Sequence, residues 1–272
     1  MNDYSTYALM DASLMMDAEQ KPWTKSKHRP SWMVSIYERP AWDVSPFIVD
    51  IESAYLGNKI DIVMAMSNFL RTGIHVSFID TKLSAMELAD HLRQFGYVVD
   101  EARGELTLRL ADGIAIPWIQ EVMSPEQWAA IHKPIRRWRF HSRDGRLVEL
   151  PAPEDVEPVD TPLKFSAHQI AALEKSHEPD HLMSNLRAMR NDHLWAPTPQ
   201  LEIELAAKIL KIWRDSGQVD SSTLLIFARA VFDTKGRLLD LPSLMQILSQ
   251  DDPVLVRRTI ERAAASQEEG RP

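Results

Sequence analysis

Short runs of alternating apolar and polar residues fill much of the first half of the chain, and their period of two predicts β-strands. Between them, apolar residues recur every three or four positions, as they do on one face of an amphipathic helix. The predicted strands are 6–13, 32–38, 45–51, 74–80 and 105–112, and the predicted helices are 60–72, 84–95 and 114–123, with a further helix from Ser124. This mixture predicts an α+β lobe with a largely antiparallel sheet.

Residues 134–150 predict a β-hairpin that closes this lobe. Two alternating runs flank Asp144-Gly145, a pair that suits a turn with positive φ. The first run places two arginines on one face of the strand and two aromatic residues on the other, in the order Arg137, Trp138, Arg139, Phe140. We therefore expect the aromatic side chains to hold the strand to the core and the arginines to point outward.

The second half of the chain shows only helical periodicity. Residues 151–162, PAPEDVEPVDTP, precede it and contain four acidic residues and no basic one. Proline cannot donate a backbone hydrogen bond and like charges repel, so this composition is typical of an extended linker. We predict an α+β domain over 1–150, a linker over 151–163 and an all-helical lobe over 164–272.

The chain has 272 residues and a net charge of −8, so its overall field repels nucleic acids and acidic membranes. It has no cysteine, which excludes disulfides and thiolate metal sites and is typical of a reducing cytosol. The N-terminus shows no signal peptide, and the longest apolar run, 62–70, is far shorter than the roughly 20 residues of a bilayer span. We therefore expect a cytoplasmic protein with no membrane insertion.

Recurrent enzyme motifs do not occur in the sequence: there is no G-x-S-x-G, Walker loop, G-x-G-x-x-G or H-E-x-x-H. His177 and His181 have the spacing of helical metal ligands, but we expect Pro179 between them to interrupt the helix. The sequence therefore assigns no catalytic residue, no metal site and no cofactor.

Basic residues cluster around the predicted hairpin. The cluster comprises Lys133, Arg136, Arg137, Arg139, Arg143 and Arg146. Such a stripe is often a solvated sheet face, and basic residues interleaved with aromatic ones also occur in nucleic-acid binders. Arginine and tryptophan are also enriched where proteins bind one another, so the candidate partner-binding residues are Arg136, Arg137, Arg139 and Arg146. Because the side chains of Arg137 and Arg139 face away from Trp138, we expect charge reversal at these two positions to leave the fold intact.

Two further features lie early in the chain. Basic residues interleaved with Trp23 occur over 21–29, and methionines are concentrated over 10–66. Methionine fills irregular gaps in cores and also lines adaptable binding grooves, so both roles are open for residues such as Met64 and Met66.

Arg109 and Asp112 lie at the end of the strand predicted over 105–112. They are three residues apart, so they would lie on opposite faces of a strand unless the chain turns between them. An arginine at this place can hold an acidic side chain, and Asp112 can cap the helix expected near Ile114. We therefore expect both residues to be structural rather than catalytic.

A series of motifs in a fixed order resembles a bacterial protein family. The series comprises YALMDAS at the start, Leu108-Arg109-Leu110 with Asp112, Pro125-Glu126-Gln127, Pro134 with Trp138, and Asp144-Gly145 with Leu150. In this order the motifs resemble those of the effector-loading adaptors, also called effector chaperones, of type VI secretion (Tap/Tec type, with the VgrG-associated adaptor domain). The residues from 165 onward resemble the variable helical extension of that family.

The resemblance implies a non-enzymatic adaptor of the bacterial cytoplasm that binds a cognate toxic effector and helps to load it onto the spike protein VgrG. It implies no cofactor and no nucleic-acid partner, and it makes Arg109, Asp112, Trp138, Asp144 and Gly145 a structural motif. The oligomeric state and the lobe that holds each partner stay open. Two other classes also stay open: a small hydrolase with an unrecognised active site, and a nucleic-acid-binding protein.

Overall fold

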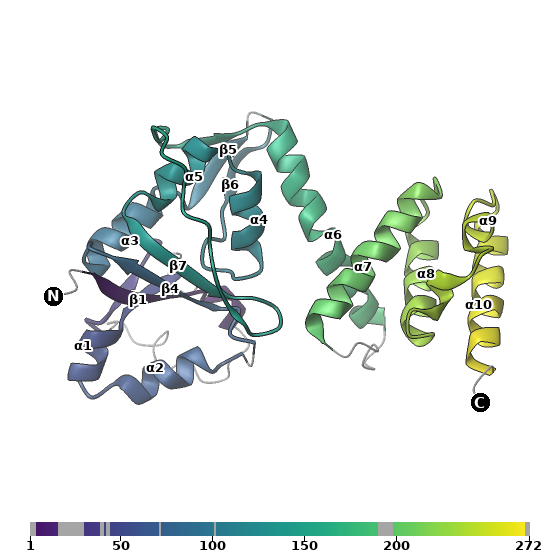
Figure 1. The fold of residues 1–272 in the computed structure, drawn as a ribbon, viewed down its shortest axis with the longest axis horizontal. Coiled ribbons are helices and arrows are strands. Elements are labelled where there is room, and N and C mark those ends of the chain that lie inside the picture. The colour runs from purple at the N-terminus through teal and green to yellow at the C-terminus, as the bar shows by residue number, and fades with distance from the viewer. Residues whose placement is uncertain are drawn as a thin grey trace. The chain divides into compact units, whose positions relative to one another are not determined.

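The computed structural model describes residues 4–15, 30–38, 41, 44–70, 72–100, 102–189 and 198–269. The chain divides into two compact units, Met1–Leu173 and Glu174–Pro272. The basic segment 21–29 lies outside the described residues. Figure 1 shows the mixed first unit and the helical second unit, which confirms the predicted α+β class with an all-helical C-terminal part.

The first unit is built on a six-stranded sheet in which all strand pairs are antiparallel. Its strand order is β2-β3-β1-β4-β7-β8. In chain order the strands are β1 (Ser5–Met10), β2 (Met33–Ser35), β3 (Phe47–Asp50), β4 (Val76–Thr81), β7 (Ile135–His141) and β8 (Leu147–Glu149). All six coincide with predicted strands or with the predicted hairpin, although β1 begins one residue before its predicted range and β4 ends one residue after it.

Helices cover both faces of this sheet, so its central strands are apolar on both sides (Figure 1). On one face, Leu9, Ile79 and Trp138 pack against α3 (Ala85–Arg93), α4 (Ala115–Val122) and α5 (Pro125–His132). On the other face, Ala8 and Met10 pack against α1 (Ile51–Leu56) and α2 (Ile60–Ser67). The unbroken burial of β1 from Tyr7 to Met10 follows from this three-layer arrangement.

The first unit also contains a second, three-stranded sheet, two strands of which follow α3 in the sequence. It has the order β6-β5-β9 and comprises β5 (Tyr97–Asp100), β6 (Gly104–Thr107) and β9 (Leu163–Phe165). Strand β9 pairs with β5 in parallel, and the sequence pattern predicted neither of these two strands. The strand predicted over 105–112 is shorter in the structure and ends at Thr107. Residues 109–112 form a turn instead, in which the Asp112 amide donates to the Arg109 carbonyl at 3.2 Å.

Residues after the predicted linker belong to the first unit rather than to the helical one. Leu163, Phe165 and Ile170 are buried in the core that contains Trp138. The side-chain amide of Gln127 donates to the Lys164 carbonyl at 2.7 Å, which ties β9 to the start of α5. The division of the chain therefore falls after Leu173, within a helix, whereas the sequence places the helical lobe from residue 164.

Two helices of the first unit begin at capping boxes, and one of them starts at Ser124, where the sequence predicts the beginning of a helix. The Ser84 hydroxyl accepts from the Glu87 amide while the Glu87 carboxylate accepts from the Ser84 amide. Ser124 and Gln127 make the same reciprocal pair, with Pro125 at the first helical position. These short-range hydrogen bonds fix where α3 and α5 start.

The second unit consists of helices around a core that includes Trp213, Phe227 and Phe232. Its elements are the remainder of α6 (Ala167–Met189), then α7 (Pro199–Asp215), α8 (Ser221–Asp233), the 3-10 helix η3 (Arg237–Asp240), α9 (Leu244–Leu248) and α10 (Pro253–Glu269). The expectation that Pro179 interrupts the helix is wrong, because α6 runs through it. Proline removes one backbone donor, and buried Leu182, Met183 and Leu186 pack the following turns into the core.

In the part of the chain that the structure describes, no helix is both long enough and apolar enough to cross a membrane.

The buried His132 of α5 predicts a loss of stability in mild acid. The residue is 2% exposed, its ring lies 5.3 Å from that of Trp128, and neither ring nitrogen has a hydrogen-bond partner on another described residue. Burial lowers the pKa of His132 to about 4. Between about pH 6.5, the ordinary pKa of histidine, and pH 4, His132 binds a proton in the unfolded chain but not in the folded one. The free energy of unfolding therefore decreases as the pH decreases through this range.

We expect this residue to contribute a loss of about 2 kcal/mol in the free energy of unfolding between pH 7 and pH 5. Urea unfolding at both pH values measures it. The His132→Leu variant should lose that part of the pH dependence, whereas His168→Gln, at an exposed position of α6, should keep the wild-type dependence. An unchanged pH dependence in His132→Leu would contradict the assignment.

Candidate partner-binding surface

The two faces of β7 are divided as the alternating pattern predicts. Trp138 is fully buried, and its indole N–H donates to the Ser77 hydroxyl at 3.1 Å on the neighbouring strand. Phe140 is buried on the same face. The side chains of Arg137 and Arg139 lie on the opposite face, 47% and 26% exposed.

Asp80 of β4 binds both of these arginines. It lies opposite Arg137 in the sheet register and is 6% exposed. Arg137 Nε donates to Asp80 Oδ2 at 3.1 Å, and Arg139 Nη2 donates to Oδ1 at 2.9 Å. The Thr6 hydroxyl donates to Oδ1 at 2.8 Å, so three strands meet at one buried carboxylate.

The sharing of Asp80 changes the expectation for the basic stripe. Arg137 and Arg139 are tied to a buried acid, so they contribute to the fold as well as to the surface. Charge reversal at both positions would place two new carboxylates beside Asp80. The structure therefore leads us to expect that this double variant destabilises the fold, in place of the expectation from the sequence that the fold stays intact.

Arg136 and Arg146 are held only at the surface. The Arg136 guanidinium lies 4.6 Å from the centre of the Tyr4 ring, where Lys82 also lies at 5.2 Å. Arg146 Nε lies 2.6 Å from Asp144 Oδ2, and its side chain is 79% exposed. Exposed contacts of this kind add little to stability, so both charges are available to a partner.

The turn of the hairpin relies on Gly145, which has a φ of +77°. Asp144 itself does not have positive φ; its carboxylate accepts from the Ser142 hydroxyl at 2.6 Å. That hydrogen bond, together with Arg146, lowers the pKa of Asp144. The loop spans the residues between His141 and Leu147, and the pair identified in the sequence lies at its tip.

A second polar cluster joins the end of β1 to the start of α4. Arg109 Nη2 lies 3.1 Å from Asp11 Oδ2, and Nη1 lies 3.1 Å from Asp112 Oδ2. Both aspartates are buried, at 2% and 4% exposure. Asp112 Oδ1 also accepts from the Ile114 amide at 2.8 Å, and Asp11 Oδ1 accepts from the Ser13 amide at 2.8 Å. The cluster therefore connects two backbone turns through one guanidinium.

Sequence reasoning identified Arg109 and Asp112 but missed Asp11. Asp11 and Arg109 are 98 residues apart, and no local pattern links them. Burial raises the pKa of Asp112, and the neighbouring Arg109 opposes that rise. The arrangement is that of a partly buried ion pair that holds two chain segments together.

The remaining sequence features fall at separate places. His177 and His181 lie one turn apart on α6, and no group of three or more potential metal ligands occurs among the described residues. Met10, Met33 and Met66 are buried in the core under α1 and α2, whereas Met64 is 54% exposed. The three buried methionines therefore fill the core, whereas Met64 lies at the surface.

Comparison with known families matches part of the first unit. Residues 6–130 match the family described as "Domain of unknown function (DUF4123)". The match runs from β1 to α5 and does not include the β7–β8 hairpin or the second unit. Neither the curated proteins nor the solved structures contain a significant match to the chain.

The shared carboxylate predicts that charge reversal at Arg137 and Arg139 destabilises the first unit. We expect the Arg137→Glu/Arg139→Glu variant to lose roughly 2–4 kcal/mol in free energy of unfolding, measured by urea titration. Adding Asp80→Asn to that variant should recover part of the loss because it removes the repulsion. Arg136→Glu/Arg146→Glu serves as the control and should lose less than about 1 kcal/mol. Equal small losses in both double variants would show that Asp80 is not a structural anchor.

The dual role of Asp112 predicts a larger effect than capping alone. Asp112→Ala removes a cap and leaves Arg109 with one carboxylate, so we expect a loss of about 2 kcal/mol. Asp112→Asn can still accept from the Ile114 amide and should lose less. Asp50→Ala removes the exposed N-cap of α1, where Asp50 accepts from the Ser53 amide at 2.9 Å, and should cost about 1 kcal/mol. If thermal melts show that Asp112→Asn or Asp50→Ala loses as much stability as Asp112→Ala, the assignment is contradicted.

Proposed function

We propose that this chain is a non-enzymatic adaptor of type VI secretion, which binds a cognate effector in the bacterial cytoplasm and helps to load it onto the VgrG spike. The ordered series of motifs over residues 106–150 carries the proposal. The family matched over 6–130 has no function in its description, so the functional assignment rests on the motifs and on surface chemistry.

The surface of the hairpin supports a protein partner. Arg146 is 79% exposed, and Arg136 is also exposed, beside Tyr4. Arginine beside an aromatic ring is a frequent element of protein interfaces. Neither side chain is needed to neutralise a buried acid, so both can exchange their present contacts for an acidic group on a partner.

The charge distribution favours a protein partner over a nucleic acid. The net charge of the chain is −8, and Asp80 offsets part of the positive charge of Arg137 and Arg139. A phosphate backbone is bound by extended, unpaired positive charge, which gives a steep salt dependence. The hairpin offers a small basic area, which suits an acidic patch of a folded protein.

The test is a binding experiment with the proteins encoded beside this chain. Co-expression with the neighbouring effector and VgrG should give a stable stoichiometric complex. Arg136→Glu/Arg146→Glu should lower the association rate at low salt, because exposed charges act mainly on encounter. The difference from wild type should shrink at high salt, where screening shortens to about 3 Å at 1 M.

Lys208→Glu, an exposed reversal on α7 of the second unit, is the matched control and should associate at the wild-type rate. If the hairpin variant associates with both partners as fast as wild type at low salt, the basic surface is not the interface. If no complex forms, but single-stranded nucleic acid binds with steep salt dependence, the nucleic-acid alternative replaces the adaptor. Hydrolysis by the isolated chain would favour the hydrolase alternative.

A further inference from the structure

Strand β8 forms one edge of the six-stranded sheet. In the described part of the chain it is last in the strand order, and its neighbour is β7. The Leu150 amide donates to the Trp138 carbonyl at 2.8 Å at one end of this pairing. Hydrogen-bonded pairs recur at every second residue of an antiparallel ladder, so Val148 also turns its amide and carbonyl toward β7. Leu147 and Glu149 therefore turn their backbone groups away from the sheet.

These outward backbone groups are unused. No hydrogen bond joins the amide or carbonyl of Leu147 or Glu149 to another described residue. The turn at Gly145 bounds this edge on one side, and Pro151, which has no amide hydrogen, bounds it on the other. Leu147 and Glu149 therefore each leave one donor and one acceptor open. An extended polypeptide offers donors and acceptors at the same spacing, so the groups that are open fit a β-strand as the ligand.

The side chains of β8 are exposed and apolar on both faces of the sheet. Leu147 is 47% exposed and Val148 is 39% exposed, and successive residues of a strand point to opposite faces. On the other edge strands described, the apolar side chains are buried or half-buried, as for Met33 on β2, Leu163 on β9 and Leu106 on β6. Exposed edges are commonly protected by charge or by cover. An added strand would therefore bury apolar surface on both sides of β8.

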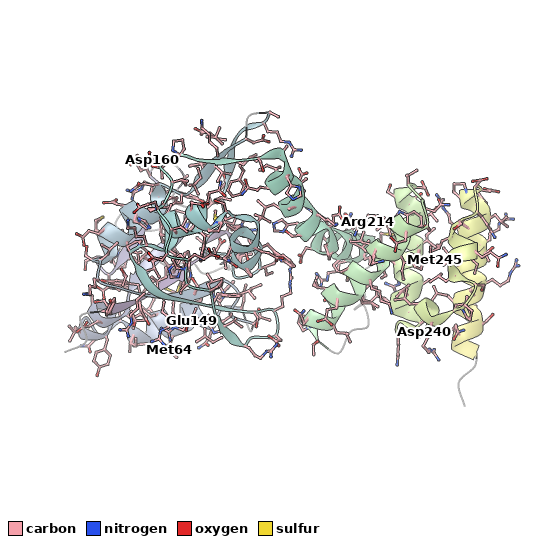
Figure 2. All side chains as sticks on the ribbon, turned by 45° about the horizontal axis from the view of Figure 1, so that its top comes forward. Met64, Glu149, Asp160, Arg214, Asp240 and Met245 are labelled. Carbon is pink, nitrogen blue, oxygen red and sulfur yellow. The ribbon has the colours of Figure 1, made fainter. Side chains whose placement is uncertain are left out.

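The charge of Glu149 selects the residue that lies opposite it. Glu149, labelled in Figure 2, is exposed at this edge. It faces Arg139 in the register with β7, but Arg139 pairs with Asp80, and Glu149 forms no ion pair with another described residue. Opposite charges directly across two strands stabilise their pairing, whereas like charges destabilise it. The strand that fits therefore has Lys or Arg opposite Glu149 and an apolar residue opposite Leu147.

A second copy of this chain does not supply that pattern. Two copies can satisfy the outward groups of both β8 strands in one antiparallel register, because these groups belong to Leu147 and Glu149. That register places Glu149 of each copy opposite Leu147 of the other, which is apolar. The exposed carboxylate therefore favours a different protein.

We propose that β8 binds an extended segment of another protein as an added antiparallel strand, with the sequence basic–apolar–apolar from its N-terminal end. The basic residue lies opposite Glu149, the middle residue lies beside Val148 on the other face, and the third lies opposite Leu147. The antiparallel direction agrees with every other pair in this sheet and lets two residues of the segment exchange all the open groups. The inference rests on the proposed function in so far as it takes the ligand to be part of a protein.

Defined peptides test the edge without a known partner. The probe is a fluorescein-labelled Thr-Thr-Lys-Val-Val-Thr-Thr peptide, and fluorescence anisotropy with the full chain measures its affinity. We expect it to bind about tenfold more tightly than the same peptide with Glu in place of Lys. N-methylation of Lys and of the second Val removes the donors that face β8 and should weaken binding about tenfold or more. N-methylation of the first Val, whose amide points away from β8, is the matched control and should leave affinity unchanged.

Variants of the chain test the same contacts from the other side. Leu147→Pro removes an outward amide without breaking a hydrogen bond to β7, and it should weaken the Lys peptide by about tenfold or more. Leu147→Val keeps the amide and an apolar side chain and should bind as wild type does. Glu149→Lys should reverse the charge preference, so that the Glu peptide binds more tightly than the Lys peptide. Thermal melts of the three variants should match that of wild type, because both positions are exposed.

Three results would overturn the proposal. They are no peptide binding below about 1 mM, equal effects of N-methylation at the facing and the control positions, and an unchanged charge preference in Glu149→Lys. A wild-type dimer that dissociates in Leu147→Pro, measured by sedimentation, would assign the edge to a second copy of this chain and would also overturn it. The outcome is separable from that of the proposed function. If the effector and VgrG complex still forms without peptide binding, only the edge assignment fails, and if wild type forms no complex, the adaptor function fails independently.

Discussion

The buried carboxylate of Asp80 divides the basic residues of the hairpin into two groups. It accepts from Thr6 on β1 and from Arg137 and Arg139 on β7, so it joins three strands at one point of the sheet. A single carboxylate inside a sheet is unfavourable unless its oxygens are paired, and both arginines therefore stay on this face. Arg136, at the start of β7, contacts Tyr4, and Arg146, in the loop, pairs with Asp144. These two arginines form the second group, which lies at the surface.

The same register places an apolar side chain beside the ion pairs. Phe78 precedes Asp80 by two residues on β4, and Arg139 lies opposite Phe78 on β7. Residues two apart on a strand share a face, so the polar and apolar parts of this surface are fixed to each other by the sheet.

The polar cluster around Arg109 gives the first unit a second long-range connection. It binds Asp11 at the end of β1 and Asp112 before α4, and both carboxylates also accept backbone amides. Gln127 and Gln169 make a comparable link through a hydrogen bond of 2.7 Å between their side chains. Through it, the start of α6 is held against α5, which explains why the first unit extends beyond the proline-rich segment.

The sequence by itself determined the local features of this protein: the α+β class, the two faces of β7, the helix start at Ser124 and the turn at Gly145. These depend on side-chain period, capping and φ preference, which act over a few residues and are visible in the order of the chain. Only the tertiary structure decided that Asp11 pairs with Arg109, that Asp80 binds two arginines, that β9 joins β5 and that α6 continues through Pro179. Each of these depends on a contact between distant segments, or on packing that outweighs a local preference, and a pattern of neighbours along the chain contains no information about either.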